Sequence, residues 1–356
     1  MRIYFDDLVF SLQKIGGISV YWSSFLEKVD QSEKNEVCLI KVGESNNILS
    51  GFKWAKSVES DLKIPINLLR ILPLLKSLAP KSIFHSSYLR VSLQRGVCNV
   101  VTVHDLAAED RMINGIRRYL KLWLQSFSIK KADGIICVSE STKRNLLSHY
   151  PNLKPNRIKT IYHGCSSQFF PFTTKHTTNQ KTLLFVGGRG VYKNFSACIE
   201  VMKILRDYHL IMIGGGKLSL SEKNHLNILF PKRYTHYEQL DTVSLNVCYN
   251  KAHCLFYPTI YEGFGLPILE AMNAGCPIVS SDIPAIREVA QDAALLIKNP
   301  NDSVAFAKAI TSLEDDHVKA SLISKGLKRA KCFSLETQFL ETMDFYEKVY
   351  RTKFNL

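Results

Sequence analysis

Hydrophobic and polar positions along the chain alternate between two patterns. Short apolar runs rich in Val, Ile and Leu are separated by longer stretches in which apolar residues return every three or four positions. The short runs are typical of strands buried in a parallel sheet, and the longer stretches are typical of amphipathic helices. The alternation therefore predicts an α/β fold with parallel sheets.

The predicted strands form two series along the 356 residues. The first series covers residues 1–5, 37–42, 82–85, 100–103, 134–138 and 157–161, and the second covers 181–186, 210–213, 234–235, 254–257, 278–280 and 294–297. Between the series lies a polar stretch without periodicity, which indicates a linker. We therefore predict a domain at 1–170, a linker at 171–180, a second domain at 181–333 and a closing helix at 334–356. Two such doubly wound domains would bind ligands in a cleft between the carboxyl ends of their sheets.

The composition favours a soluble, cytoplasmic protein. Hydrophobic residues make up 46% of the chain, and no run approaches the roughly 20 apolar residues that a membrane-spanning helix needs. Asp6 and Asp7 stand where a secretion signal would need an apolar core. The nine cysteines are an odd number without a Cys-x-x-Cys pair, which favours free thiols over disulfides or a zinc site. We expect no metal and no cofactor.

The chain is basic, with a formal net charge of +14, and the excess is concentrated in its first half. Residues 1–172 hold 24 Lys/Arg against 14 Asp/Glu, and the remainder holds 22 against 18. Such a surplus indicates an anionic partner. Residues 111–123 mix cations with apolar and aromatic side chains, which fits either a face lying on an anionic membrane or an ordinary helix with solvated charges. A nucleic-acid-binding protein is a further alternative, but no known nucleic-acid-binding motif accompanies the charge.

The most informative motif runs from residue 261 to residue 272, YEGFGLPILEAM. Gly263 and Gly265 can form a tight turn that leaves the backbone open to a ligand, and Pro267 suits the first position of a helix. Glu262 precedes the turn and Glu270 lies about one turn inside the helix, so both carboxylates can face one pocket beside a helix N-terminus. Such a helix start favours phosphate, and carboxylates accept hydrogen bonds from sugar hydroxyls. The alternative is a surface loop with two solvated glutamates.

A second motif, residues 185–195, places glycines and two cations after a strand. Gly188 would let the backbone approach a ligand, while Arg189 and Lys193 set two positive charges four residues apart. Cations held against a nucleoside diphosphate would stabilise its negative charge as it leaves. A solvated basic turn is the alternative.

In this combination the chain resembles the retaining glycosyltransferases of the GT-B fold numbered family 4, the glycosyl transferases group 1, and among them the bacterial O-antigen mannosyltransferases. The resemblance implies two Rossmann-like domains facing across a cleft and a C-terminal helix that crosses back to the first domain. It also implies catalytic roles for Glu262, His104, Arg189 and Lys193. The donor-binding residues that it implies are Gly16, Gly17, Gly188, Arg189, Lys193, Gly214, Tyr237, Glu262, Gly263, Phe264, Gly265, Leu266 and Glu270.

Within this set, the cations would hold the diphosphate, Glu270 the ribose, and Glu262 the donor sugar. His104 follows a strand and would touch that sugar, although a lone histidine is more often structural. The pair Gly16-Gly17 is equally well explained as a helix-start turn.

We therefore expect a metal-independent transferase that uses a nucleotide sugar, with GDP-mannose favoured over a UDP-sugar. The acceptor would be a glycan or a polyprenyl-diphosphate-linked intermediate of surface polysaccharide, reached at the inner face of the cytoplasmic membrane. A sugar-nucleotide epimerase on the same fold is the enzymatic alternative.

Overall fold

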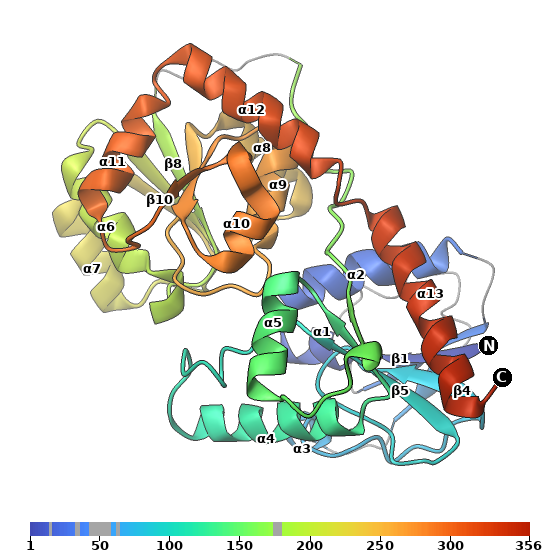
Figure 1. The fold of residues 1–356 in the computed structure, drawn as a ribbon. Coiled ribbons are helices and arrows are strands. Elements are labelled where there is room, and N and C mark those ends of the chain that lie inside the picture. Colours follow the sequence, from blue (N-terminus) through green and yellow to red (C-terminus); the bar gives the residue numbers. More distant parts are fainter. Residues whose placement is uncertain (14–15, 33–35, 43–57, 62–64, 174–179) are drawn as a thin grey trace. The chain divides into compact units, whose positions relative to one another are not determined.

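The computed structural model describes residues 1–13, 16–32, 36–42, 58–61, 65–173 and 180–356 (Figure 1). They form two compact units, the first made of Met1–Gly164 with Leu335–Leu356 and the second of Cys165–Ser334. Each unit is a doubly wound α/β fold with one parallel sheet, which confirms the predicted fold class.

The sheet of the first unit has seven strands in the order β3-β2-β1-β4-β5-β6-β7. Their bounds are β1 Arg2–Asp6, β2 Glu36–Lys41, β3 Val58–Ser60, β4 Ser82–His85, β5 Val97–Val103, β6 Gly134–Cys137 and β7 Ile158–Thr160. The sequence pattern predicts all of these except β3, a short edge strand that pairs with β2. The helices are α1 Leu8–Leu12, α2 Gly17–Asp30, α3 Ile66–Leu69, α4 Gly115–Lys131, α5 Glu140–His149, η3 Pro155–Arg157 and α13 Leu335–Phe354.

Alternate residues of the interior strand β5 face two different hydrophobic cores. Cys98 and Val100 pack with α2 and α13 on one face of the sheet, and Val101 and Val103 pack with α4 and α5 on the other. Burial on both faces explains why five of its seven residues, all except Asn99 and Thr102, are apolar.

The C-terminal helix α13 belongs to the first unit, as the resemblance implies. Phe345 and Val349 pack over β6, where a Cβ atom on Gly134 would lie 2.8 Å from Val349 Cγ2. Tyr346 is fully buried, and its hydroxyl lies 2.5 Å from His85 Nδ1. The helix therefore fills part of the core of the first unit.

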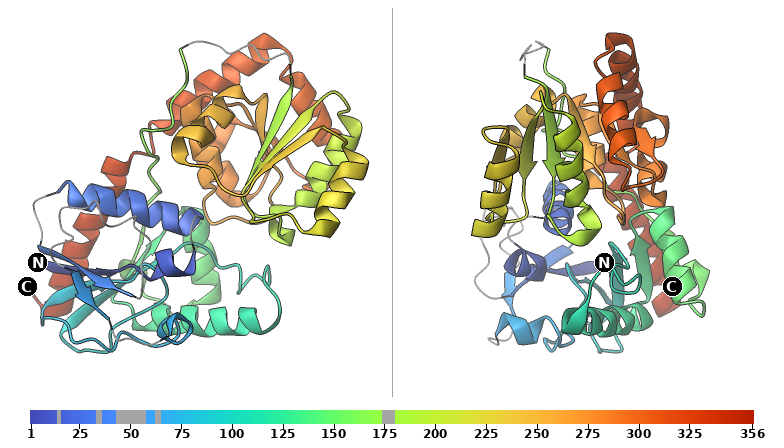
Figure 2. Two further views of the ribbon diagram at one scale, coloured as in Figure 1. Left: turned by 180° about the vertical axis from the view of Figure 1, so that it is seen from behind. Right: turned by 90° about the vertical axis from the view of Figure 1, so that its left-hand side faces the viewer.

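The second unit has a six-stranded sheet in the order β10-β9-β8-β11-β12-β13, with helices on both faces (Figure 2). Its strands are β8 Thr182–Val186, β9 His209–Ile213, β10 Tyr234–Tyr237, β11 Cys254–Tyr257, β12 Ile278–Ser281 and β13 Leu295–Ile297. Its helices are η4 Val191–Lys193, α6 Phe195–Ile204, α7 Leu220–Leu229, α8 Thr242–Lys251, α9 Leu266–Ala274, α10 Pro284–Ala290, η5 Gln291–Ala293, α11 Ser303–Ser312 and α12 Asp316–Ala330. All six strands match predicted runs.

The chain passes from the first unit to the second at Gly164, earlier than the predicted boundary at residue 170. Segment 165–172 belongs to the second unit because side chains of α8 bind its backbone. The Phe170 N–H donates to Asn246 Oδ1 over 3.3 Å, and the Phe172 N–H donates to Asn250 Oδ1 over 2.7 Å. The predicted linker 171–180 lies partly outside the described residues, which resume at 180.

Candidate active site

The polar centre of the second unit is an ion pair between Lys193 and Glu262. Lys193 ends η4 after strand β8, and Glu262 lies in the loop between β11 and α9. Lys193 Nζ lies 2.5 Å from Glu262 Oε1, and the two side chains are only 16% and 12% exposed. Burial opposes the charge of Lys193, but the Glu262 carboxylate outweighs burial and raises the pKa of the ammonium group above its ordinary value. The lysine is therefore a fixed cation at neutral pH.

Two hydroxyl groups complete the environment of Glu262, and neither is among the predicted site residues. Tyr257 OH donates to Glu262 Oε1 over 2.6 Å, and Thr259 Oγ1 lies 3.0 Å from the same oxygen. Thr259 Oγ1 also lies 2.9 Å from the Tyr192 carbonyl, which ties the loop after β11 to the loop after β8. A signal for Tyr257 was available, because it ends a predicted buried strand and so lies at the carboxyl edge of the sheet.

Arg189 has a separate set of partners. Its Nε atom lies 2.9 Å from Glu222 Oε1, and its terminal nitrogens donate to the carbonyls of Gly214 and Lys217 over 3.0 Å each. Within the part of the chain that the structure describes, all its polar partners lie on α7, on β10 and on the loop after β9. The hydrogen bond from Arg189 lowers the pKa of Glu222 to about 2. The two predicted cations are thus fixed by different carboxylates.

The glycines of this region serve two purposes. Gly214 and Gly215 have positive φ angles of 98° and 76°, and a Cβ atom on Gly215 would lie 2.7 Å from Arg189 Nη1. Gly215 therefore makes room for the arginine, whereas a Cβ atom on Gly214 would lie 3.3 Å from the Gly187 carbonyl oxygen. A Cβ atom on Gly188 would meet open space, so packing does not require glycine there. The close approach of a ligand stays a prediction for Gly188.

The glycine-rich turn opens directly into α9. Gly265 has a φ angle of 98°, and a Cβ atom there would lie 2.6 Å from Ile286 Cδ1, so only glycine fits. The helix begins at Leu266, so Pro267 takes its second position and not the first position that was predicted. No side chain of the described residues caps this helix start. Phe264 is 3% exposed and its ring packs edge-on against Phe333, so contact of its backbone with a donor stays a prediction.

Glu270 lies on the second turn of α9 and is only 8% exposed. Its Oε2 atom accepts a hydrogen bond of 2.8 Å from Tyr249 OH. Burial raises the pKa of Glu270 to about 7, and the Tyr249 hydroxyl opposes that rise. The two glutamates of the motif therefore belong to different hydrogen-bond groups, Glu262 with Lys193 and Glu270 with Tyr249.

His104 belongs to the first unit, where it follows β5. Its ring packs edge-on against Tyr21 at 4.9 Å between centroids, and the ring of His163 lies 5.7 Å away. Burial lowers the pKa of His104 to about 4, so the imidazole is neutral at pH 7. Its Nε2 atom is buried without a hydrogen-bond partner among the described residues. Neighbouring Asp105 lies 2.7 Å from Lys121 Nζ and thereby orients the loop.

The remaining predicted residues lie at element boundaries. Gly16 precedes α2 and Gly17 begins it, and the Gly16 N–H donates to Ser19 Oγ over 2.9 Å, so the pair forms a helix-start turn. Residues 14 and 15 of that loop lie outside the described residues. Tyr237 ends β10, is 40% exposed, and accepts the Gly214 N–H through its carbonyl over 2.9 Å.

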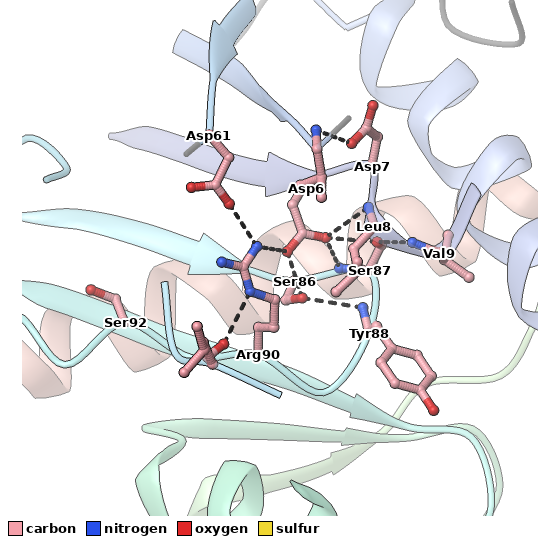
Figure 3. A network of polar contacts seen from close by, with 12 residues as sticks. Asp6, Asp7, Leu8, Val9, Asp61, Ser86, Ser87, Tyr88, Arg90 and Ser92 are labelled. Carbon is pink, nitrogen blue, oxygen red and sulfur yellow. Dashed lines mark hydrogen bonds and ion pairs between the residues drawn. The ribbon is translucent and has the colours of Figure 1, made fainter. Parts of the chain in front are cut away.

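A buried polar network at the carboxyl edge of the first sheet was not predicted (Figure 3). Asp6 accepts hydrogen bonds from the hydroxyls of Ser86 and Ser87 over 2.7 Å each. Arg90 is 2% exposed, and its Nη1 atom lies 2.9 Å from Asp61 Oδ2 and 3.9 Å from Asp6 Oδ2. The network fixes the loops that follow β1 and β4. Strand ends with Asp and Ser are common, so no specific signal for the network was present in the sequence.

Among the described residues, no group of three or more His, Cys, Asp or Glu side chains could hold a metal ion. No described helix is both long and apolar enough to cross a membrane.

Two doubly wound units, with a fixed lysine–glutamate pair beside a glycine-rich helix start, define the class of GT-B glycosyltransferases. Comparison with known proteins agrees. Residues 166–329 match the family Glycosyl transferases group 1, and residues 31–169 match Glycosyltransferase Family 4. The chain belongs to this glycosyltransferase family.

Two curated relatives are O-antigen enzymes. The O-antigen chain mannosyltransferase B of Escherichia coli is 30% identical over 290 residues, which cover 73% of this chain and 72% of that protein. The O-antigen chain mannosyltransferase RfbU of Salmonella typhimurium is 29% identical over 218 residues, which span 60% of each chain.

Solved structures share the fold over nearly the whole chain. Sucrose-phosphate synthase from Thermosynechococcus elongatus has a TM-score of 0.77 at 17% identity, covering 99% of this chain and 100% of that one. HepE of Anabaena, determined in complex with UDP-glucose, has a TM-score of 0.74 at 13% identity, covering 98% and 100%. At these identities the likeness concerns the fold.

Proposed function

We propose that this glycosyltransferase moves a sugar, mannose by preference, from a nucleotide-diphosphate donor with retention of the anomeric configuration. The acceptor would be a glycan or a polyprenyl-diphosphate-linked intermediate of a bacterial surface polysaccharide. The names of the two O-antigen mannosyltransferases support mannose and this class of acceptor. The observation that carries the proposal is the buried Lys193–Glu262 pair next to the start of α9.

The two members of the pair would act on different parts of the donor. Lys193 and the first N–H groups of α9 would hold the diphosphate, whose negative charge grows as the glycosidic bond breaks. Glu262 would accept hydrogen bonds from the donor sugar through the oxygen that Lys193 does not occupy. Because these positive groups are supplied by the protein, the proposal needs no divalent metal.

Arg189 would add a second positive charge near the diphosphate. Its guanidinium already binds the carbonyls of the loop after β9, so it is held in place before a ligand arrives. The proposed role requires the guanidinium to exchange its contact with Glu222 for contacts with phosphate oxygens. For neutral His104, whose Nε2 atom has no hydrogen-bond partner among the described residues, we propose a contact with a sugar hydroxyl.

The test is an assay of the purified protein with GDP-mannose, with UDP-glucose, and with a polyprenyl-diphosphate-linked saccharide as acceptor. We expect acceptor-dependent release of GDP in the presence of EDTA, and an α-linked product by NMR. Isomerisation of the donor without acceptor would instead indicate an epimerase, and a β-linked product would exclude retention.

The exposed face of α4 supports a position on an anionic membrane surface. Ile116, Tyr119 and Trp123 recur at helical spacing and are 84%, 67% and 55% exposed. Residues 111–131 contain six Lys/Arg and no Asp/Glu. An apolar stripe with aromatic residues, flanked by cations, suits the interface of a bilayer with anionic headgroups. We propose that this face, formed by Ile116, Tyr119 and Trp123, brings the enzyme to its lipid-linked acceptor.

A further inference from the structure

Tyr249 is fully buried on the last turn of α8, and its hydroxyl points at one oxygen of Glu270. The bond of 2.8 Å engages Oε2. Among the described residues, Oε1 of Glu270 has no hydrogen-bond partner. One carboxylate oxygen is therefore bound by the protein, and the other is available to a ligand.

The tyrosine ring is fixed by a neighbouring aromatic ring. It packs edge-on against Phe169, with centroids 5.9 Å apart. On the same helix, Asn246 and Asn250 bind the backbone of Phe170 and Phe172, so the segment next to the ring is held as well. A hydroxyl held this way determines the orientation of the carboxylate that it contacts.

From this geometry we propose that Tyr249 is a positioning residue, which holds Glu270 so that its Oε1 atom receives the ribose hydroxyls of the nucleotide. The inference rests on the proposed function, in which Glu270 binds ribose. Glu270 needs such a partner, because a buried carboxylate without a hydrogen-bond donor is strongly disfavoured.

The tyrosine also affects the charge of Glu270. Burial raises the pKa of the carboxyl to about 7, and the Tyr249 bond opposes that rise. Removing the hydroxyl would raise the pKa further, so more Glu270 would be protonated at neutral pH. Its ability to accept hydrogen bonds from ribose would then recover only as the pH is increased.

The experiment compares ribose with deoxyribose nucleotides. Calorimetry measures the binding of GDP, 2′-deoxy-GDP, UDP and 2′-deoxy-UDP to the full chain between pH 6 and pH 9. For the nucleotide that binds, we expect the native protein to prefer the ribose form by roughly tenfold to a hundredfold, as for a hydrogen bond to a charged group. Tyr249→Phe should lose most of this preference at pH 7 and regain part of it at pH 9.

Tyr208→Phe is the matched control. Tyr208 is also buried in the second unit, and its hydroxyl donates to Glu314 over 2.6 Å. This variant loses the same kind of bond but should keep the ribose preference and its pH profile. In turnover assays, Tyr249→Phe should raise the donor KM and leave kcat nearly unchanged, because ribose is remote from the reacting bond.

A double-mutant cycle with Glu270→Gln provides a readout that a purely structural role would not change. In the background of the Glu270→Gln variant, Tyr249→Phe should have little further effect on the ribose preference. Should Tyr249→Phe fail to fold, the pH dependence of the ribose preference is measured in Glu270→Gln instead. We expect that preference not to change with pH.

The outcomes separate the two proposals. If the native protein binds no nucleoside diphosphate, the proposed function fails. If it binds the nucleotide and Tyr249→Phe keeps the full ribose preference at every pH, the function stands and the positioning role is overturned. A native protein that binds ribose and deoxyribose forms equally would also overturn it.

Discussion

Lys193 and Glu262 are 69 residues apart in the chain, yet their charged atoms meet at 2.5 Å in the second unit. The contact exists because β8 and β11 are neighbouring parallel strands, whose following loops emerge at the same edge of the sheet. Thr259 and Tyr257 then lock the two loops together. The pair is a fixed feature of the folded unit and the natural first target for mutation.

Lys193→Ala should reduce turnover of the donor by about a hundredfold or more, since it removes a positive group held against the leaving diphosphate. Steady-state kinetics with GDP-mannose would measure this loss of turnover. Lys203→Ala is the control, because Lys203 pairs with Glu200 on the exposed surface of the same unit and should leave turnover unchanged. Near-native turnover of Lys193→Ala would contradict the assigned role.

Arg189 and Glu222 can be separated by a pair of variants. Arg189→Ala should lower turnover by about a hundredfold, whereas Glu222→Gln should keep turnover and tighten nucleoside-diphosphate binding severalfold, because it frees the guanidinium from its carboxylate. Glutamine retains the hydrogen bond that caps α7 through Ser219. Calorimetry with GDP measures the binding. Loss of binding in Glu222→Gln would show that the ion pair itself, rather than the free cation, is required.

His104, whose Nε2 atom is buried, should make stability depend on pH. Its pKa is about 4 in the folded protein against an ordinary 6.5, so between these values the unfolded chain carries the extra proton. The contribution of neutral His104 to the free energy of unfolding is fully present above pH 6.5. It is lost as the pH falls toward 4, by about 1.4 kcal/mol per pH unit. Urea unfolding measures how far the free energy of unfolding falls between pH 7 and pH 5. This fall should be about 2 kcal/mol smaller in His104→Asn than in the native protein. Between pH 7 and pH 9 the free energy of unfolding should change equally in the native protein and in His104→Asn. If it also falls equally in both between pH 7 and pH 5, this account is wrong.

The membrane proposal can be tested on the α4 face. Trp123→Ser and Ile116→Ser should each weaken flotation with vesicles that contain anionic lipid, and high salt should weaken binding of the native protein. Leu340→Ser is the matched control, because Leu340 is a similarly exposed apolar residue of the first unit, 53% accessible on α13. Binding that ignores lipid charge, or equal loss in all three variants, would argue against this face.

Attachment of α13 to the first unit depends on a glycine. Gly134→Ala would place a methyl group 2.8 Å from Val349 and 3.1 Å from Phe345, and should destabilise the protein by about 1–3 kcal/mol. Gly96→Ala is the control, since its nearest contact would be an ordinary 3.5 Å from Pro80. Urea unfolding of both variants measures the difference, and equal stabilities would show that α13 adjusts at little cost.

Local patterns were enough to predict much of this protein. Twelve of the thirteen strands among the described residues follow from short apolar runs, and the glycine-rich start of α9 follows from residues 263–267. These features depend on backbone conformation and burial, which neighbouring residues largely determine. The short edge strand β3 and the boundary at Gly164 escaped prediction because pairing with β2 and hydrogen bonds from α8 create them.

By itself, the sequence determined which residue types stand at the ends of strands and the starts of helices, because these positions carry local signals. Only the tertiary structure decided how they pair. Lys193 joins Glu262, Arg189 joins Glu222 and Glu270 joins Tyr249, although the motif spacing suggested two cations and two glutamates acting together. The physical reason is that charged groups near a sheet edge take whichever buried partner the neighbouring strands and helices bring within hydrogen-bond distance, and that choice depends on strand order and packing.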